Sequence, residues 1–155
     1  MSRAQCISID LGGTQVRVAL LEGTRIVRRA SAKTAVAGGP SAVLSQFETL
    51  IDQVCDGKDP KFTAGIALSS AGPLDSDAGV ILGIPTLPGW DNYPINSVLS
   101  DRFGVPVLLE GDGNAAAFGE WRHGAGRGLK NMSYLTVSTG IGGGIVLNGE
   151  LYTGT

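Results

Sequence analysis

The chain is organised around the stretch EGDGNAAAFGE, residues 110–120. An apolar run over 105–109 precedes it and predicts a strand, and the alanines predict a helix from about Asn114 to His123. Asp112 is therefore expected where the strand ends and the helix begins, beside small residues that let a ligand approach the backbone. The helix dipole and free N–H groups hold such a carboxylate ionised, so it can accept a proton from a bound hydroxyl.

A purely structural interpretation of Asp112 stands beside the catalytic one. Aspartate is a favoured N-cap residue, and most helices that begin with it perform no chemistry. Two glycine-rich segments elsewhere in the chain favour the catalytic interpretation.

The bulk composition is that of one globular domain rich in tight turns. The 24 glycines of this 155-residue chain cluster at particular positions, and the net charge of −2 disfavours nucleic acid or an anionic membrane as partner. No apolar run reaches the roughly 18 residues of a membrane span, and the N-terminus lacks a signal-peptide pattern. Cys6 and Cys55 are expected to be buried thiols. These features favour a cytoplasmic protein.

Residues 6–32 predict an antiparallel meander. Three alternating segments, at 6–10, 16–20 and 25–32, are joined by connections too short for a parallel crossover. In the turn Asp10-Leu11-Gly12-Gly13-Thr14, backbone N–H groups and the Thr14 hydroxyl can bind phosphate oxygens, and Asp10 can hold a metal ion through water. A plain β-hairpin explains the same turn equally well.

The middle of the chain adds a parallel strand to this meander. A helix over 40–55 precedes a buried strand at 64–68, and a short helix is expected over 94–103. Gly72 lies in the loop 69–75, after the carboxyl end of that strand, where ligands commonly bind, although an ordinary loop is an equally good interpretation. Trp90 is expected in the core.

Residues 132–149 repeat the pattern of the opening segment. A strand at 132–138, a glycine turn at 139–144, a strand at 145–147 and an Asn148-Gly149 hairpin turn match residues 7–23. The repeat predicts two related lobes that each carry one phosphate-binding turn. The glycine-rich residues 124–128 then place the boundary between a first lobe, 1–124, and the start of a second, 125–155.

At this point the chain resembles the ROK family of repressors, open reading frames and kinases, within the actin-like, Hsp70-like ATPase fold. Five motifs occur in the expected order, at residues 10–14, 71–75, 87–90, 112–120 and 138–145. The resemblance implies an α/β, ribonuclease H-like lobe whose mixed sheet combines an antiparallel meander with parallel strands and flanking helices. It also implies ATP- and Mg²⁺-dependent phosphorylation of a hexose or N-acylhexosamine.

The resemblance assigns roles residue by residue. Asp112 matches the general base that takes the proton from the sugar hydroxyl, and Asp10 matches the residue near Mg²⁺. The nucleotide-binding positions are Asp10, Gly12, Gly13, Thr14, Thr139, Gly140, Gly142 and Gly143. The positions facing the sugar are Gly72, Thr86 and Asn114.

Two departures from the family pattern qualify these expectations. Gly111 stands where the family usually has an asparagine that contacts a sugar hydroxyl, so one expected hydrogen bond to the substrate is missing. The family's Glu-x-Gly-His motif, its cysteine zinc cluster and its adenosine-binding segment lie beyond the sequence given. We therefore expect any structural zinc to lie in those segments beyond the sequence given. We also expect the 155-residue chain alone to be inactive.

Two alternatives to the kinase remain open at this stage. A sugar-sensing transcriptional regulator of the family carries a helix-turn-helix before the first strand, and few residues precede it here. A non-catalytic lobe is the other alternative. Exposed apolar surface between lobes would also permit self-association, including a homodimer.

Overall fold

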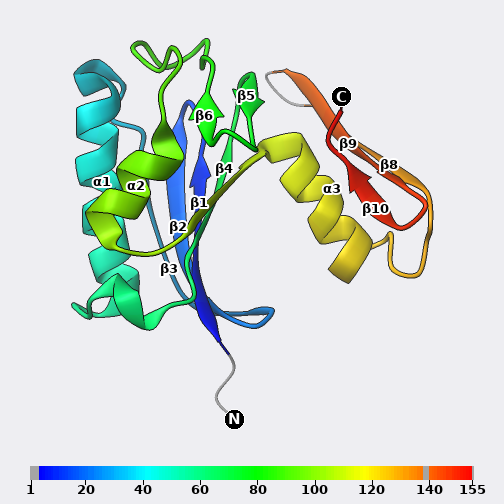
Figure 1. Ribbon diagram of the computed structural model, residues 1–155, viewed down its shortest axis with the longest axis horizontal. Helices are drawn as coiled ribbons and strands as arrows, with labels where there is room; N and C mark the ends of the chain where they lie inside the picture. The colour runs from blue at the N-terminus through cyan, green and yellow to red at the C-terminus, as the bar shows by residue number, and fades with distance from the viewer. Residues whose placement is uncertain (1–3, 138–139, 155) are drawn as a thin grey trace. The chain divides into compact units, whose positions relative to one another are not determined.

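The computed structural model describes residues 4–137 and 140–154 (Figure 1). The chain forms two compact units that meet between Glu110 and Gly111, and each is described by itself. The helices and strands of the first unit are β1 Gln5–Leu11, β2 Gln15–Glu22, β3 Arg25–Lys33, α1 Gly39–Cys55, β4 Ile66–Ser70, β5 Leu74–Asp75, β6 Val80–Ile81, α2 Ile95–Phe103 and β7 Val107–Gly111. The remaining elements are α3 Asp112–His123, β8 Met132–Val137, β9 Ile141–Leu147 and β10 Glu150–Tyr152.

A mixed five-stranded sheet forms the centre of the first unit. Its strand order is β3-β2-β1-β4-β7, with β1, β2 and β3 antiparallel and β4 parallel to β1. The predicted mixed sheet is thereby confirmed. Strand β4 begins and ends two residues later than expected. Ser69 and Ser70 therefore belong to the strand, and Ser70 lies opposite Leu11.

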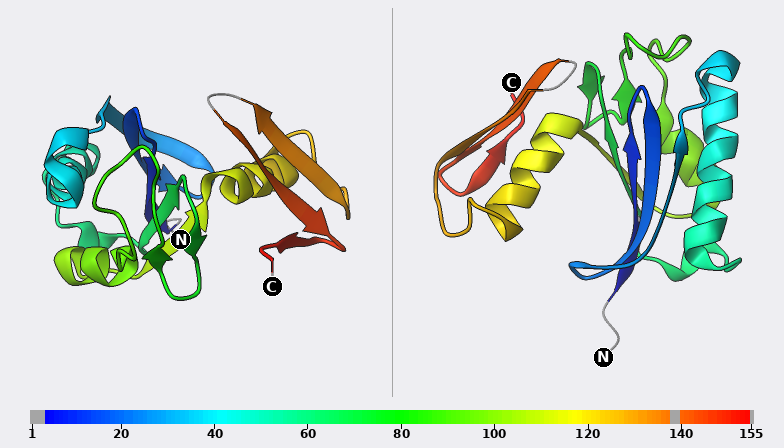
Figure 2. Two further views of the ribbon diagram at one scale, coloured as in Figure 1. Left: turned by 90° about the horizontal axis from the view of Figure 1, so that it is seen from above. Right: turned by 180° about the vertical axis from the view of Figure 1, so that it is seen from behind.

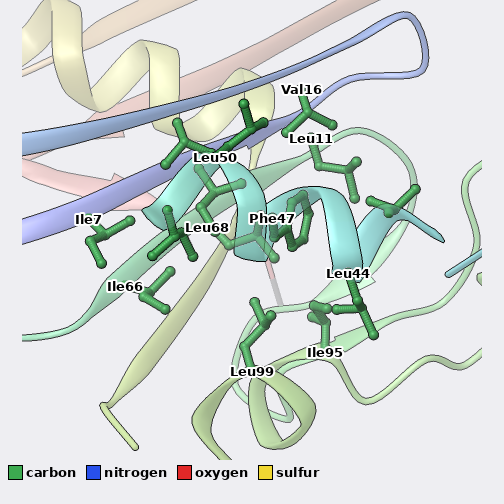
Figure 3. Packing of buried hydrophobic residues seen from close by; sticks show 14 of the residues in the cluster. Ile7, Leu11, Val16, Leu44, Phe47, Leu50, Ile66, Leu68, Ile95 and Leu99 are labelled. Carbon is green, nitrogen blue, oxygen red and sulfur yellow. The ribbon is translucent and has the colours of Figure 1, made fainter. Parts of the chain in front are cut away.

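Both helices of this unit lie on the same side of the sheet (Figure 2). Helix α1 buries the apolar positions that its helical spacing predicted, among them Phe47, which is fully buried. Phe47 lies among strand residues such as Leu68 and the α2 residues Ile95 and Leu99 (Figure 3). Burial of such side chains contributes about 1.5–3 kcal/mol each, so this face holds the unit together.

The burial expected for Trp90 and for the two cysteines is confirmed at Trp90 and Cys55 but not at Cys6. Trp90 is only 1% exposed, as the sequence predicted, and its ring lies 5.0 Å from that of Tyr93. Cys55 is buried, whereas Cys6 is partly exposed. The expectation for Cys6 was wrong because alternate side chains of a strand point to opposite faces, and in β1 the inward positions are those of Ile7 and Ile9.

The second unit consists of helix α3 and an antiparallel sheet with strand order β10-β9-β8. The hairpin turn at Asn148 and Gly149 is confirmed, since both residues have positive φ angles, 54° and 84°. Helix α3 begins at Asp112 rather than near Asn114, and its N-cap is Gly111. The carboxylate of Asp112 is therefore carried by the first helical residue.

The second glycine segment is mostly strand, which corrects the expected turn at 139–144. Gly142, Gly143 and Gly144 lie in β9, opposite Thr136, Leu135 and Tyr134 of β8. Gly143 and Gly144 allow close packing, because a Cβ atom at either position would collide with Tyr134 or Ala117. Ser138 and Thr139 lie outside the described residues.

Residues 124–128 are tied to the end of α3. The N–H groups of Gly124 and Gly126 donate to the carbonyl oxygen of Glu120 at 2.9 and 3.0 Å. The side chain of Glu120 accepts a further bond from the N–H of Ala125 at 3.0 Å. The lobe boundary expected at 124–125 stays a prediction.

Candidate active site

The turn between β1 and β2 is held by hydrogen bonds to its carbonyl groups. The N–H of Gly12 donates to the carbonyl oxygen of Gln15 at 3.1 Å, which closes the turn. Thr34, just after β3, donates from its hydroxyl to the Gly12 carbonyl oxygen at 2.7 Å and from its N–H to that of Thr14 at 3.0 Å. Within residues 4–137 and 140–154, the N–H groups of Gly13 and Thr14 donate no hydrogen bond. Such N–H groups can donate hydrogen bonds to phosphate oxygens.

Asp10 lies on the sheet face opposite α1, between two polar partners from neighbouring strands. Arg17 Nη1 lies 2.7 Å from Asp10 Oδ2, and the Ser69 hydroxyl donates to Oδ1 at 3.1 Å. The strand register explains both contacts, because Asp10 is paired with Arg17 on β2 and with Ser69 on β4. The ion pair is largely solvent-exposed, so Asp10 can exchange Arg17 for a ligand at small cost.

A pocket of about 480 Å³ opens on this same face. Asp10 and Arg17 line it together with Arg29, Ser8 and Ser31. Two guanidinium groups against one carboxylate give it a positive balance that suits an anion. Neither Arg17 nor Arg29 was predicted from the sequence, although the alternation of the two strands offered a signal for Arg17, which lies opposite Asp10.

Thr86 lies directly against the glycine turn. A Cβ atom added at Gly13 would collide with the Thr86 hydroxyl, so the absence of a side chain is what permits this approach. Gly72 has a φ of +92°, and a Cβ atom there would collide with the carbonyl oxygen of Gly83. The structure therefore brings Thr86, predicted to face the sugar, together with Gly13, predicted to bind nucleotide.

Asp112 presents its carboxylate at the start of α3 in the second unit. The side chain is exposed, and Oδ1 accepts a hydrogen bond from the N–H of Gly113 at 2.8 Å. This bond holds the carboxylate at the N-terminal end of the helix, where the dipole favours negative charge. The carboxylate is thus accessible to a ligand, as a general base requires.

The other predicted positions of the second unit lie along β9 and the adjoining helix turn. Asn114 and Gly143 together line a separate pocket within the second unit, also of about 480 Å³. Gly142 lies beside Gly143 in the strand. Gly140 is exposed just before β9. Thr139, also predicted to bind nucleotide, lies outside the described residues.

The donor set can be tested against the expected Mg²⁺ ion. In the part of the chain that the structure describes, no three His, Cys, Asp or Glu residues cluster so as to hold a metal ion. Magnesium in kinases keeps several waters and is bound by one or two carboxylates plus substrate phosphates. The single carboxylate of Asp10, beside a turn whose Gly13 and Thr14 N–H groups can bind phosphate oxygens, fits that mode of binding.

None of the described helices is both long and apolar enough to cross a membrane.

The comparisons of this chain with known proteins agree on one family. The profile of the ROK family matches residues 6–155. The chain is 37% identical to a glucokinase of Thermotoga maritima, over 99% of this chain and 48% of the relative. It is 30% identical to an N-acetylmannosamine kinase of Salmonella paratyphi B, over 96% of this chain and 49% of the relative. The chain therefore spans about half the length of these curated relatives.

A solved structure shares the fold. The crystal structure of a ROK family glucokinase from Streptomyces griseus, in complex with glucose and AMPPNP, superposes with a TM-score of 0.87 at 29% identity. The similarity covers 98% of this chain and 47% of that one. The actin-like, Hsp70-like fold expected from the sequence is thereby confirmed.

Proposed function

Because the chain belongs to the ROK family, we propose that the protein containing it is an ATP-dependent kinase that phosphorylates a hydroxyl of a hexose or N-acylhexosamine. The named relatives, a glucokinase and an N-acetylmannosamine kinase, support this range of sugars. The glucose and AMPPNP held by the Streptomyces griseus glucokinase support ATP as the donor.

One observation carries the proposal: the turn between β1 and β2, which follows directly after Asp10 and Leu11, leaves the N–H groups of Gly13 and Thr14 without partners in the described structure. Phosphoryl transfer depends mainly on positioning the phosphates and offsetting their charge. Backbone donors supply the first requirement. Mg²⁺ held by Asp10 through water would supply the second.

The proposed general base is Asp112. Its exposed carboxylate would accept the proton from the sugar hydroxyl while that oxygen attacks the γ-phosphorus and the bond from phosphorus to the β,γ-bridging oxygen breaks, releasing ADP. The residues proposed to contact the nucleotide further along the chain are Thr139, Gly140, Gly142 and Gly143. Gly72, Thr86 and Asn114 would face the sugar.

Gly111 bears on the choice of sugar. It offers no side chain where the family usually has asparagine, so one hydroxyl of the sugar loses a hydrogen-bond partner. A site that lacks such a partner discriminates less strongly against sugars without that hydroxyl. The protein is therefore proposed to accept several related sugars.

The test is ADP release by the full-length protein over a panel of hexoses and N-acylated hexosamines. Asp112→Asn should abolish sugar-dependent ADP release while sugar binding, followed by tryptophan fluorescence or calorimetry, is retained. Asp101→Asn, at an exposed position in α2, is the matched control and should keep full activity. Full activity of the Asp112 variant would refute the role of that residue.

The two alternative functions, a sugar-sensing regulator and a non-catalytic lobe, predict a different result in the ADP-release assay. Either would bind a sugar or a partner without releasing ADP from any sugar in the panel. Inactivity of the isolated 155-residue chain, a structural zinc site outside it, a homodimer and a cytoplasmic location stay predictions.

A further inference from the structure

We infer that Thr34 is a positioning residue that prepares the turn between β1 and β2 for phosphate, an inference that rests on the proposed nucleotide-binding role of that turn. Thr34 is not among the residues that the sequence motifs pick out. It is buried, with 9% of its surface exposed, and it follows directly after β3.

Every polar group of Thr34 is engaged. Its hydroxyl donates to the Gly12 carbonyl oxygen at 2.7 Å and its N–H donates to the Thr14 carbonyl oxygen at 3.0 Å. Its own carbonyl oxygen accepts from the N–H of Val36 at 2.9 Å. A residue with three such bonds has little freedom to move.

These bonds decide which groups of the turn face a ligand. A carbonyl oxygen carries partial negative charge and repels phosphate, whereas an N–H group attracts it. Thr34 ties back the carbonyl oxygens of Gly12 and Thr14. The N–H groups of Gly13 and Thr14 have no partner among the described residues and remain for an anion.

Helix α1 fixes Thr34 in turn. The Gln46 side chain donates from Nε2 to the Lys33 carbonyl oxygen at 2.6 Å and accepts at Oε1 from the N–H of Ala35 at 3.3 Å. One amide thus bonds to the backbone on both sides of Thr34. The contacts run from α1 through Gln46 and Thr34 to the turn.

The chain provides a matched control in Thr63. Its hydroxyl donates to the Pro60 carbonyl oxygen at 2.8 Å and it is 8% exposed, so it resembles Thr34 in burial and in bonding. Thr63 precedes β4, where the neighbouring Ala64 N–H donates to Gln5 at the start of β1. The Gly12 turn lies at the other end of β1.

The experiment measures binding of inorganic triphosphate to the full-length protein by calorimetry, and chemical shifts of the Gly13 and Thr14 amides by NMR. Thr34→Val keeps the shape and the N–H group but removes the hydroxyl. We expect its dissociation constant for triphosphate to rise about tenfold, since an unpaired carbonyl then faces the anion. Thr34→Ser keeps the hydroxyl and should bind within about twofold of wild type.

The control variant separates positioning from general stability. Thr63→Val should lose as much stability as Thr34→Val yet bind triphosphate as the wild type does. Gln46→Met, which leaves Thr34 intact, should weaken binding by a smaller factor. If Thr34→Val does not fold, the Gln46 variant and the wild-type amide shifts decide the question.

Either of two results overturns the inference: normal triphosphate binding by Thr34→Val, or equal losses for the Thr34 and Thr63 variants. Absence of triphosphate-induced shifts at Gly13 and Thr14 in the wild type overturns it as well. A protein that releases ADP with a sugar, but whose Thr34→Val variant binds triphosphate normally, refutes only the role of Thr34. Failure to release ADP with any sugar refutes the kinase, while the amide shifts still report on the turn.

Discussion

Ala117 of helix α3 and Gly144 of strand β9 lie in direct contact, so that a Cβ atom added at Gly144 would stand 2.6 Å from that of Ala117. It would also stand 2.9 Å from the carbonyl oxygen of Gly113. The helix that carries Asp112 therefore rests on the strand that carries Gly142 and Gly143. Close packing of this kind leaves no space for a methyl group.

We predict that Gly144→Ala destabilises the protein by about 1–3 kcal/mol, because the added methyl group must push α3 away from β9. Gly119→Ala is the control, since nothing lies within 4 Å of its position. That variant should be stabilised by about 0.5–1 kcal/mol, because alanine is favoured over glycine in a helix. Denaturant unfolding measures both, and a Gly144 variant as stable as wild type would contradict the packing argument.

The sequence predicted those elements whose pattern reports directly on burial. The spacing of Val43, Phe47 and Ile51 defined α1, and the alternation of residues 6–32 defined the meander. The extent of β9 could not be predicted in this way. Glycines that turn the chain and glycines that let a helix approach have the same sequence, and only the partner across the contact tells them apart.

The residues of the candidate site also fall into two groups, those that local sequence motifs predicted and those that they did not. Asp10, Gly12, Gly13 and Asp112 were predicted because they lie in motifs. Thr34 and Arg17 were missed because each bonds to a residue of another strand or turn, and local patterns do not record strand register.

We predict that Arg17→Met raises the KM for MgATP several-fold in the full-length protein. Arg17 pairs with Asp10 and lines the pocket beside it, so its loss leaves the carboxylate less well oriented and the pocket less positive. Arg25→Met removes a comparable exposed pair, with Glu22, and should leave the KM unchanged. Both should change stability by less than about 1 kcal/mol. Equal KM values for the two variants would argue against a role of Arg17 at the nucleotide.

We predict that Trp90→Phe changes the free energy of unfolding by less than about 1.5 kcal/mol, because the indole N–H is buried without a hydrogen-bond partner in the described structure. Removing that unpaired donor offsets part of the loss of ring area. Trp90→Ala should cost about 3–5 kcal/mol, because it leaves a cavity. Equal losses in thermal unfolding for the two variants would show that the N–H group has a partner.

Stability should fall at alkaline pH because of Cys55. Burial raises the pKa of its thiol above the ordinary value of 9.0, the charge of Asp52 raises the pKa further, and Arg28 opposes both. Well below pH 9.0 the thiol is protonated in both folded and unfolded chains and contributes no pH dependence. Above it the unfolded chain releases the proton first, so the folded state loses stability by up to about 1.4 kcal/mol per pH unit.

Urea unfolding of wild type and Cys55→Ala at about pH 8 and about pH 10 measures this contribution. The alanine variant should show the smaller loss between the two values. The difference isolates Cys55, because the other groups that titrate there are common to both proteins. Identical losses would mean that the thiol has the same pKa in both states.

The contact between Gly72 and Gly83 limits how the proposed sugar site can evolve. Neither an enlarged side chain nor an ordinary backbone angle is available at Gly72, whose φ is +92° and whose Cβ position is filled by a carbonyl oxygen. A lineage that changes its preferred sugar must therefore substitute elsewhere, and Gly111 and Thr86 are the positions with a side chain to gain or exchange. Libraries that seek new sugar specificities should hold Gly72 constant and vary those two.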